Sequence, residues 1–127
     1  SRLVAVGGHY GFEPTAYAAT AGVANAGLTN LMRQFSWALG GRGITAHLVA
    51  PGPADTERLR NVANARAAQR GISVEEVFDE LKEESAIHAF TTPQQVAWGI
   101  CLLLAPEADA MAGSSLMLDS GRRRGLP

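Results

Sequence analysis

The feature that most limits the fold is an alternation of short apolar runs with longer segments of helical character. Three runs have the length and composition of β-strands, and they span Leu3–Val6, Ile44–Ala50 and Ser114–Leu118. The segments between them fit helices at about residues 15–39, 57–70, 73–84 and 92–104. Strands that alternate with helices form parallel sheets with right-handed crossovers. The sequence therefore predicts an α/β fold, with a parallel sheet and flanking helices.

The predicted helices carry start and packing signals. In segment 15–39 apolar residues recur at helical spacing, and many alanines and glycines in its first half indicate close packing against another helix. Ser73 with Glu76 three residues later fits a capping box. Thr92 followed by Pro93 fits a helix cap with proline in the first turn.

Composition limits the class of protein. The chain has 127 residues, 46% of them hydrophobic, and a formal net charge of −1. Residues 1–127 therefore fit a single small domain or part of one. This charge gives no electrostatic basis for binding nucleic acid or an anionic membrane. No apolar run reaches the roughly 18 residues that a membrane helix needs, so we expect neither partner.

Isolated polar residues give weaker signals. The single cysteine, Cys101, lies in an apolar run, so we expect a small core residue and a reducing compartment, the cytoplasm. The three histidines are too widely spaced for a metal-ligand pattern, and we expect no metal site. His47 fits a structural role, and His9 and Tyr10 fit loop surface, with substitute active-site groups as the alternative. The run Arg122–Arg124 predicts a flexible, solvated tail.

Several motifs follow one another in a fixed order. The first strand ends in Gly7-Gly8, Tyr17 opens a long helical stretch, and the second strand leads into Pro51-Gly52-Pro53 and then Thr56. A closing strand and turn follow the last helix. In order and spacing, from Leu3 to Gly121, the chain resembles the C-terminal half of a short-chain dehydrogenase/reductase. That resemblance implies a Rossmann-like sheet, namely the second half of a doubly wound domain.

The resemblance also implies roles for individual residues. Tyr17 matches the catalytic acid of the family, although an ordinary helix residue with a packed ring is the alternative. Pro51, Gly52 and Pro53 match the turn beside the nicotinamide, and Thr56 matches the hydroxyl residue that binds its carboxamide. Thr56 equally fits a helix N-cap. The implied cofactor is NAD or NADP, and the implied reaction is hydride transfer between a carbonyl and an alcohol.

The chain departs from the family pattern at the groups that make the tyrosine reactive. Gly7-Gly8 stands where the family commonly has two serines, and Ala21 stands where it has a lysine, four residues after the tyrosine. A free phenol has a pKa of about 10, and losing one positioned acid/base group costs about 10²–10⁴ in rate. These residues also contain no glycine-rich phosphate loop. We therefore predict weak activity or none.

Other roles stay open. The alternative to an oxidoreductase is a non-catalytic family member that acts as a binding or oligomerisation module. Family members pair through the helix that carries the tyrosine, so the resemblance implies self-association through the helix beginning near Tyr17. It also leaves open a missing N-terminal half, cleaved off or supplied by another chain. A lone half-sheet would expose an edge and faces that favour association. We expect the chain not to be a monomer by itself. By the same resemblance, residues 57–89 correspond to the family's variable substrate lid, and their composition indicates no particular ligand.

Overall fold

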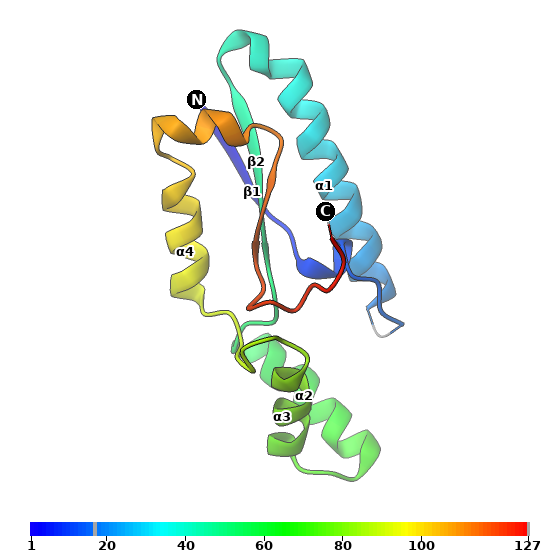
Figure 1. The fold of residues 1–127 in the computed structure, drawn as a ribbon. Helices are drawn as coiled ribbons and strands as arrows, with labels where there is room; N and C mark the ends of the chain where they lie inside the picture. Colours follow the sequence, from blue (N-terminus) through cyan, green and yellow to red (C-terminus); the bar gives the residue numbers. More distant parts are fainter. Residues whose placement is uncertain (17, 127) are drawn as a thin grey trace.

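A computed structural model describes residues 1–16 and 18–126, and within them it contains one three-stranded parallel sheet (Figure 1). The strands, in spatial order, are β1 (Arg2–Val6), β2 (Thr45–Pro51) and β3 (Ser115–Leu118). The register pairs Val6 with Val49 and Pro51 with Leu118. The predicted α/β fold, with a Rossmann-like parallel sheet and flanking helices, is confirmed.

Helices fill the connections between the strands. The α-helices are α1 (Ala19–Leu39), α2 (Glu57–Arg70), α3 (Val74–Glu83) and α4 (Pro93–Leu102). Three short 3₁₀ helices, which the sequence did not predict, are η1 (His9–Gly11), η2 (Gly40–Arg42) and η3 (Pro106–Met111). The first helix begins later than predicted, because Ala18 has φ −137° and ψ 47°, outside the helical region. No side chain caps this end of α1.

Capping residues define the starts of α3 and α4, as predicted, although Ser73 caps α3 without the reciprocal Glu76 bond of the predicted capping box. The Ser73 hydroxyl accepts a hydrogen bond from the Glu76 N–H at 3.1 Å. Thr92 and Gln95 form a reciprocal capping box, in which each side chain bonds the other residue's backbone N–H, at 3.1 and 2.9 Å. These bonds satisfy N–H groups that have no partner within the helix.

The core lies on both faces of β2, whose residues 46–50 are all buried. Side chains alternate between the faces of a strand. Ala46, Leu48 and Ala50 therefore face α1, where Met32 completes the cluster. Val49 faces the other side and packs with Leu103 and Ala108, close to α4 and η3. Figure 1 shows α1 and α4 on opposite sides of the sheet.

β1 is less buried than its apolar sequence predicts. We expected a strand covered on both faces, but Leu3 is 38% exposed and Val6 is 49% exposed. The cause is position, since β1 is an edge strand that pairs with β2 on one side only. An open edge strand presents unpaired backbone groups to any further strand.

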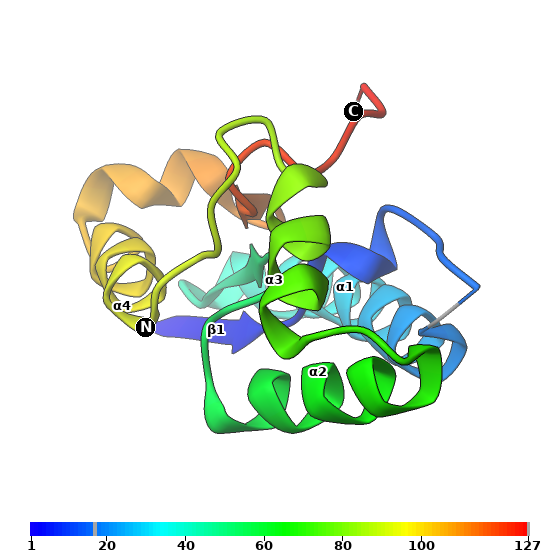
Figure 2. The same ribbon diagram turned by 90° about the horizontal axis from the view of Figure 1, so that it is seen from below.

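Helices α2 and α3 form a hairpin with a core of its own. The buried members of that core are Ala63, Ala67, Val77 and Leu81. In Figure 1 the hairpin extends beyond the lower end of the sheet, and Figure 2 shows α3 rising across α2 at a steep angle. A β-bridge between Ala54 and Thr91 joins the two connections that lead into and out of the hairpin.

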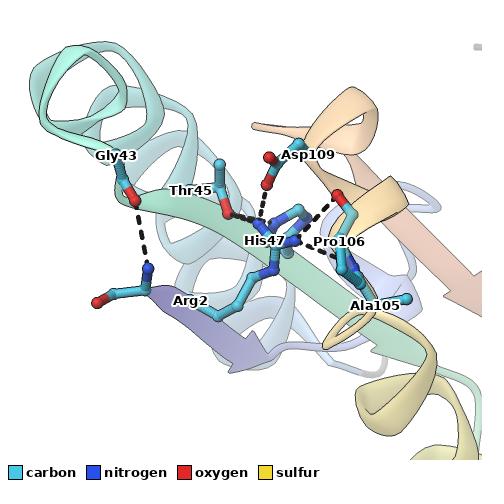
Figure 3. Close-up of polar contacts among 8 residues, drawn as sticks. Arg2, Gly43, Thr45, His47, Ala105, Pro106 and Asp109 are labelled. Atoms are coloured by element: carbon cyan, nitrogen blue, oxygen red, sulfur yellow. Dashed lines mark hydrogen bonds and ion pairs between the residues drawn. The ribbon is translucent and has the colours of Figure 1, made fainter.

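A partly buried polar network lies at the amino ends of β1 and β2 (Figure 3). His47 is fully buried, and its Nε2 lies 2.9 Å from the Thr45 hydroxyl. The Arg2 guanidinium donates to Thr45, to the Asp109 carboxylate and to the Ala105 carbonyl. Burial, and then the positive charge of Arg2, lower the pKa of His47. The structural role predicted for this histidine is confirmed.

Two predictions about burial are wrong. Cys101 is exposed, because it lies on the outward face of α4, whose inward face carries Gly99. Arg122 is only 6% exposed, and its guanidinium donates to the Leu81 carbonyl at 3.0 Å and to Glu84. The C-terminal segment is therefore anchored at Arg122. Within the part of the chain described, no helix is both long and apolar enough to cross a bilayer.

Candidate functional site

The carboxyl ends of the three strands meet at one edge of the sheet, next to the α2–α3 hairpin. The Gly7 N–H donates to the Val49 carbonyl at 2.8 Å, and the Gly52 N–H donates to the Leu118 carbonyl at 3.1 Å. These bonds continue the sheet pairing one residue beyond β1 and β2. In open α/β sheets, ligands bind in the crevice outside this edge.

A cavity of about 420 Å³ lies at this edge. Its inner wall is formed by the exits of β1 and β2 and by the start of α1, and its outer wall by α2. The lining residues from the strand exits and α1 are Gly7, Gly8, His9, Tyr10, Ala18, Thr20, Ala21, Pro51, Gly52, Pro53, Ala54 and Thr56. This volume falls within the range of small-molecule sites.

The four residues predicted to face a cofactor, Pro51, Gly52, Pro53 and Thr56, all line this cavity. Gly52 is buried, and a Cβ placed on it would lie 3.1 Å from the Cα of Asp119. Because that neighbour is backbone, glycine lets the two chain segments approach closely here. The Thr56 hydroxyl accepts from the Leu59 N–H at 3.2 Å, so Thr56 is the N-cap of α2.

Tyr17, predicted as the catalytic acid, lies outside the described residues. Its neighbour Ala18 and the alanine at the lysine position, Ala21, both line the cavity, next to Gly7 and Gly8. None of these four side chains carries a charge or a hydroxyl. The family's lysine and serine are thus missing from the cavity wall itself.

Asn25, from α1, fills the space beside Gly8. A Cβ placed on Gly8 would lie 2.7 Å from the Asn25 Nδ2. A serine at position 8 would therefore require the amide to move. The Asn25 amide thus occupies the room that a side chain at position 8 would need.

His9 is a buried residue of the site, so the prediction of loop surface is wrong for it. It is 3% exposed and stacks against Tyr10 with ring centroids 4.1 Å apart. Burial, and next the positive charge of Arg122, lower the pKa of His9 to about 4, against an opposing hydrogen bond to the Pro51 carbonyl. The imidazole is therefore neutral at pH 7.

No individual residue of α2 after Thr56 was predicted to line the site, although residues 57–89 were expected to form a substrate lid. Arg58, Leu59, Val62 and Arg66 line the cavity from this helix, and Leu81 lines it from α3. Leu59, Val62 and Arg66 follow one another at intervals of three and four residues, which places them on one helix face. That spacing was readable from the sequence, but the low hydrophobicity of the segment concealed which face turns inward.

A second cavity, of about 700 Å³, adjoins the first. His9, Tyr10, Arg66 and Leu81 line both, so the two form one cleft between the sheet edge and the hairpin. In the second cavity, Arg70 pairs with Glu80, and Arg122 pairs with Glu84. Among residues 1–16 and 18–126, no group of three or more potential ligands could hold a metal ion.

Comparison with known proteins identifies the family. A family model described as enoyl-(acyl carrier protein) reductase matches residues 3–123. Over 104 residues the chain is 30% identical to the short-chain reductase protein NovJ of Streptomyces niveus. The chain belongs to the short-chain dehydrogenase/reductase family. The chain is also 30% identical over 102 residues to an uncharacterised oxidoreductase of Mycobacterium tuberculosis.

Solved short-chain dehydrogenase/reductase structures match the fold. A family protein from Francisella tularensis superposes with a TM-score of 0.90 at 22% identity, over 96% of this chain and 50% of that one. The actinorhodin polyketide ketoreductase with NADPH gives a TM-score of 0.88 at 24% identity, over 96% of this chain and 47% of the ketoreductase.

The chain spans only part of these proteins. The match to NovJ covers 82% of this chain and 37% of NovJ, and the match to the mycobacterial oxidoreductase covers 80% of this chain and 37% of that protein. The residues described here therefore correspond to one part of a short-chain dehydrogenase/reductase.

Proposed function

We propose that this chain forms the nicotinamide- and substrate-facing half of an NAD- or NADP-dependent carbonyl reductase. The observation that carries the proposal is the cavity at the carboxyl edge of the sheet, which Pro51, Gly52, Pro53 and Thr56 line together. Family membership supports the reaction class, namely hydride transfer between a carbonyl and an alcohol. Cytoplasmic location fits the exposed Cys101 thiol, since thiols persist in reducing compartments.

The cavity residues fit the nicotinamide end of the cofactor. Pro51 and Pro53 give rigid apolar walls, and Gly52 keeps the turn close to Asp119. The Thr56 hydroxyl oxygen accepts the hydrogen bond that caps α2, so the hydroxyl hydrogen can still be donated to a carboxamide oxygen. The phosphates need a glycine-rich turn at a helix N-terminus. That element belongs to the N-terminal half, which the open edge of β1 would join.

The bound cofactor would supply the hydride. This chain would position the nicotinamide ring through Thr56 and the proline turn, and it would provide the cleft under the α2–α3 hairpin. His9 is neutral at pH 7 and so is no ready proton donor. Ala21 and Gly8 provide neither the charge nor the hydroxyl that serve the family's tyrosine. We therefore propose that the rate is about 10²–10⁴-fold below that of a member with the full set of residues.

Calorimetric titration with reduced nicotinamide mononucleotide tests the cofactor site, and variants of Thr56 separate its two roles. Thr56→Ser keeps both the cap and the O–H donor, whereas Thr56→Asp keeps the cap but has no donor at pH 7. We expect Thr56→Ser to bind like the unchanged chain and Thr56→Asp to bind about 3- to 10-fold more weakly. Absence of binding by the unchanged chain, or equal binding by Thr56→Asp, would contradict the proposed contact.

A second role, self-association through α1, is favoured by a specific stripe on that helix. Val23, Gly27, Leu31 and Phe35 recur every four residues, and the three side chains are 77%, 41% and 37% exposed. Arg33 is the sole charged residue in the sequence of α1, so two copies of this helix would meet without strong repulsion. We propose that a second copy of the chain covers this stripe.

Sedimentation velocity tests the pairing. Leu31→Glu places a charge in the middle of the stripe, and we expect it to weaken the dimer by tenfold or more. Trp98→Glu is the matched control, because Trp98 is also an exposed apolar residue, at 60%, but lies on α4. A monodisperse monomer of the unchanged chain would contradict the proposal, as would equal weakening by both variants.

A further inference from the structure

The cavity at the sheet edge has an uneven charge. Two arginines, Arg58 and Arg66, line it, and no aspartate or glutamate is among its described lining residues. His9 also lines it and is neutral at pH 7. The wall is therefore positive, in a site partly shielded from water, where a fixed charge acts more strongly than in bulk solvent.

Arg66 is the better placed of the two arginines. It is half-buried, whereas Arg58 is exposed. Its neighbours Ala63 and Ala67 are buried in the hairpin core, so the helix face that carries Arg66 is fixed against α3. A guanidinium held on a packed helix loses little further freedom when it binds an anion, which favours affinity.

Arg66 also lies where the two cavities meet. It lines the 420 Å³ cavity beside Thr56 and Ala21, and it lines the 700 Å³ cavity beside Glu13 and Arg122. A ligand with one end against the proline turn and the other end in the larger cavity would pass this side chain. Only four described residues share this position at the junction, and Arg66 is the one with a permanent charge.

We infer that Arg66 is the anion-binding residue of the cleft, and that the substrate is a carbonyl compound carrying a carboxylate or phosphate group. Arginine presents a planar fork of donors that matches both groups. That the substrate is a carbonyl compound rests on the proposed reductase function, whereas the anion site is argued from the geometry of the cleft alone.

Calorimetry with small probes at low salt tests the site. Benzoate and phenyl phosphate carry the two candidate anions on the same ring, and benzamide is the neutral match. We expect one or both anions to bind, and Arg66→Gln to weaken that binding about tenfold or more. Arg60→Gln is the matched control. Arg60 is on the same helix and pairs with Asp55, but it lines neither cavity.

Several results would overturn the inference. The first is that Arg66→Gln binds the anions as tightly as the unchanged chain. The second is that Arg60→Gln weakens anion binding as much as Arg66→Gln does. The third is that Arg66→Gln weakens benzamide binding as much as benzoate binding. If Arg66→Gln does not fold, amide NMR shifts of the unchanged chain decide, since the anions should perturb His9 and Leu81 at the junction. Shifts confined to other regions would contradict the site. A titration with reduced nicotinamide mononucleotide that shows no binding would overturn the reductase proposal and leave this anion result separate.

Discussion

Replacing Arg122 with alanine is expected to lower the free energy of unfolding by about 3 kcal/mol, because the change removes charged hydrogen bonds from a buried position. Arg122 donates to the Leu81 carbonyl at 3.0 Å and to Glu84, and its guanidinium lies 6.0 Å from the centre of the Tyr10 ring. It thus joins the C-terminal segment to α3 and η1. Urea denaturation monitored by circular dichroism measures the loss.

Arg124→Ala is the control for the Arg122 experiment. Arg124 is exposed, and its contact with Glu13 runs through its backbone N–H, which the substitution keeps. We expect a change below about 0.5 kcal/mol, as for other surface positions. If the two variants lose the same stability, the anchoring role of Arg122 is wrong and the segment is held by its backbone alone.

Lowering the pH from 7 to 5 is expected to reduce the free energy of unfolding by about 2 kcal/mol through His9 alone. The pKa of His9 is about 4 in the folded chain, below its ordinary value of 6.5. Between these values the unfolded state binds more protons than the folded state, so stability falls as the pH falls. His47, whose pKa is also lowered, adds a slope of the same sign.

His9→Gln isolates this contribution. Glutamine keeps an N–H donor for the Pro51 carbonyl but does not titrate. Urea denaturation at pH 7, 6 and 5 should therefore give a steeper loss for the unchanged chain than for the variant. Parallel losses in the two proteins would mean that His9 is accessible to protons when the chain is folded.

The sheet and the proline-glycine turn after β2 were predictable, because their signals are local. The apolar run of β2 is buried, as its sequence indicates, and it leads directly into Pro51-Gly52-Pro53. Parallel strand ends share one edge, so the place of this turn followed from the fold class. The Thr56 cap was likewise readable, since a threonine before a helical segment is a common N-cap.

The rest of the site depends on contacts between distant parts of the chain. Arg122 meets Leu81 across 41 residues, and nothing in the Arg122–Arg124 run distinguishes the buried arginine from its neighbours. His9 is buried where η1 packs against α1, and η1 itself was not predicted. Arg66 is one of several arginines on α2, and only the packing of α2 against α3 shows that it lies where the two cavities meet.

The central claim is that the carboxyl edge of the sheet binds the nicotinamide end of the cofactor. The most direct test is a titration of the ¹⁵N-labelled chain with reduced nicotinamide mononucleotide, followed by amide NMR. The account predicts saturable shifts at Gly7, Gly8, Gly52 and Thr56, which surround the cavity. An absence of shifts at millimolar nucleotide, or shifts confined to α4, would contradict it.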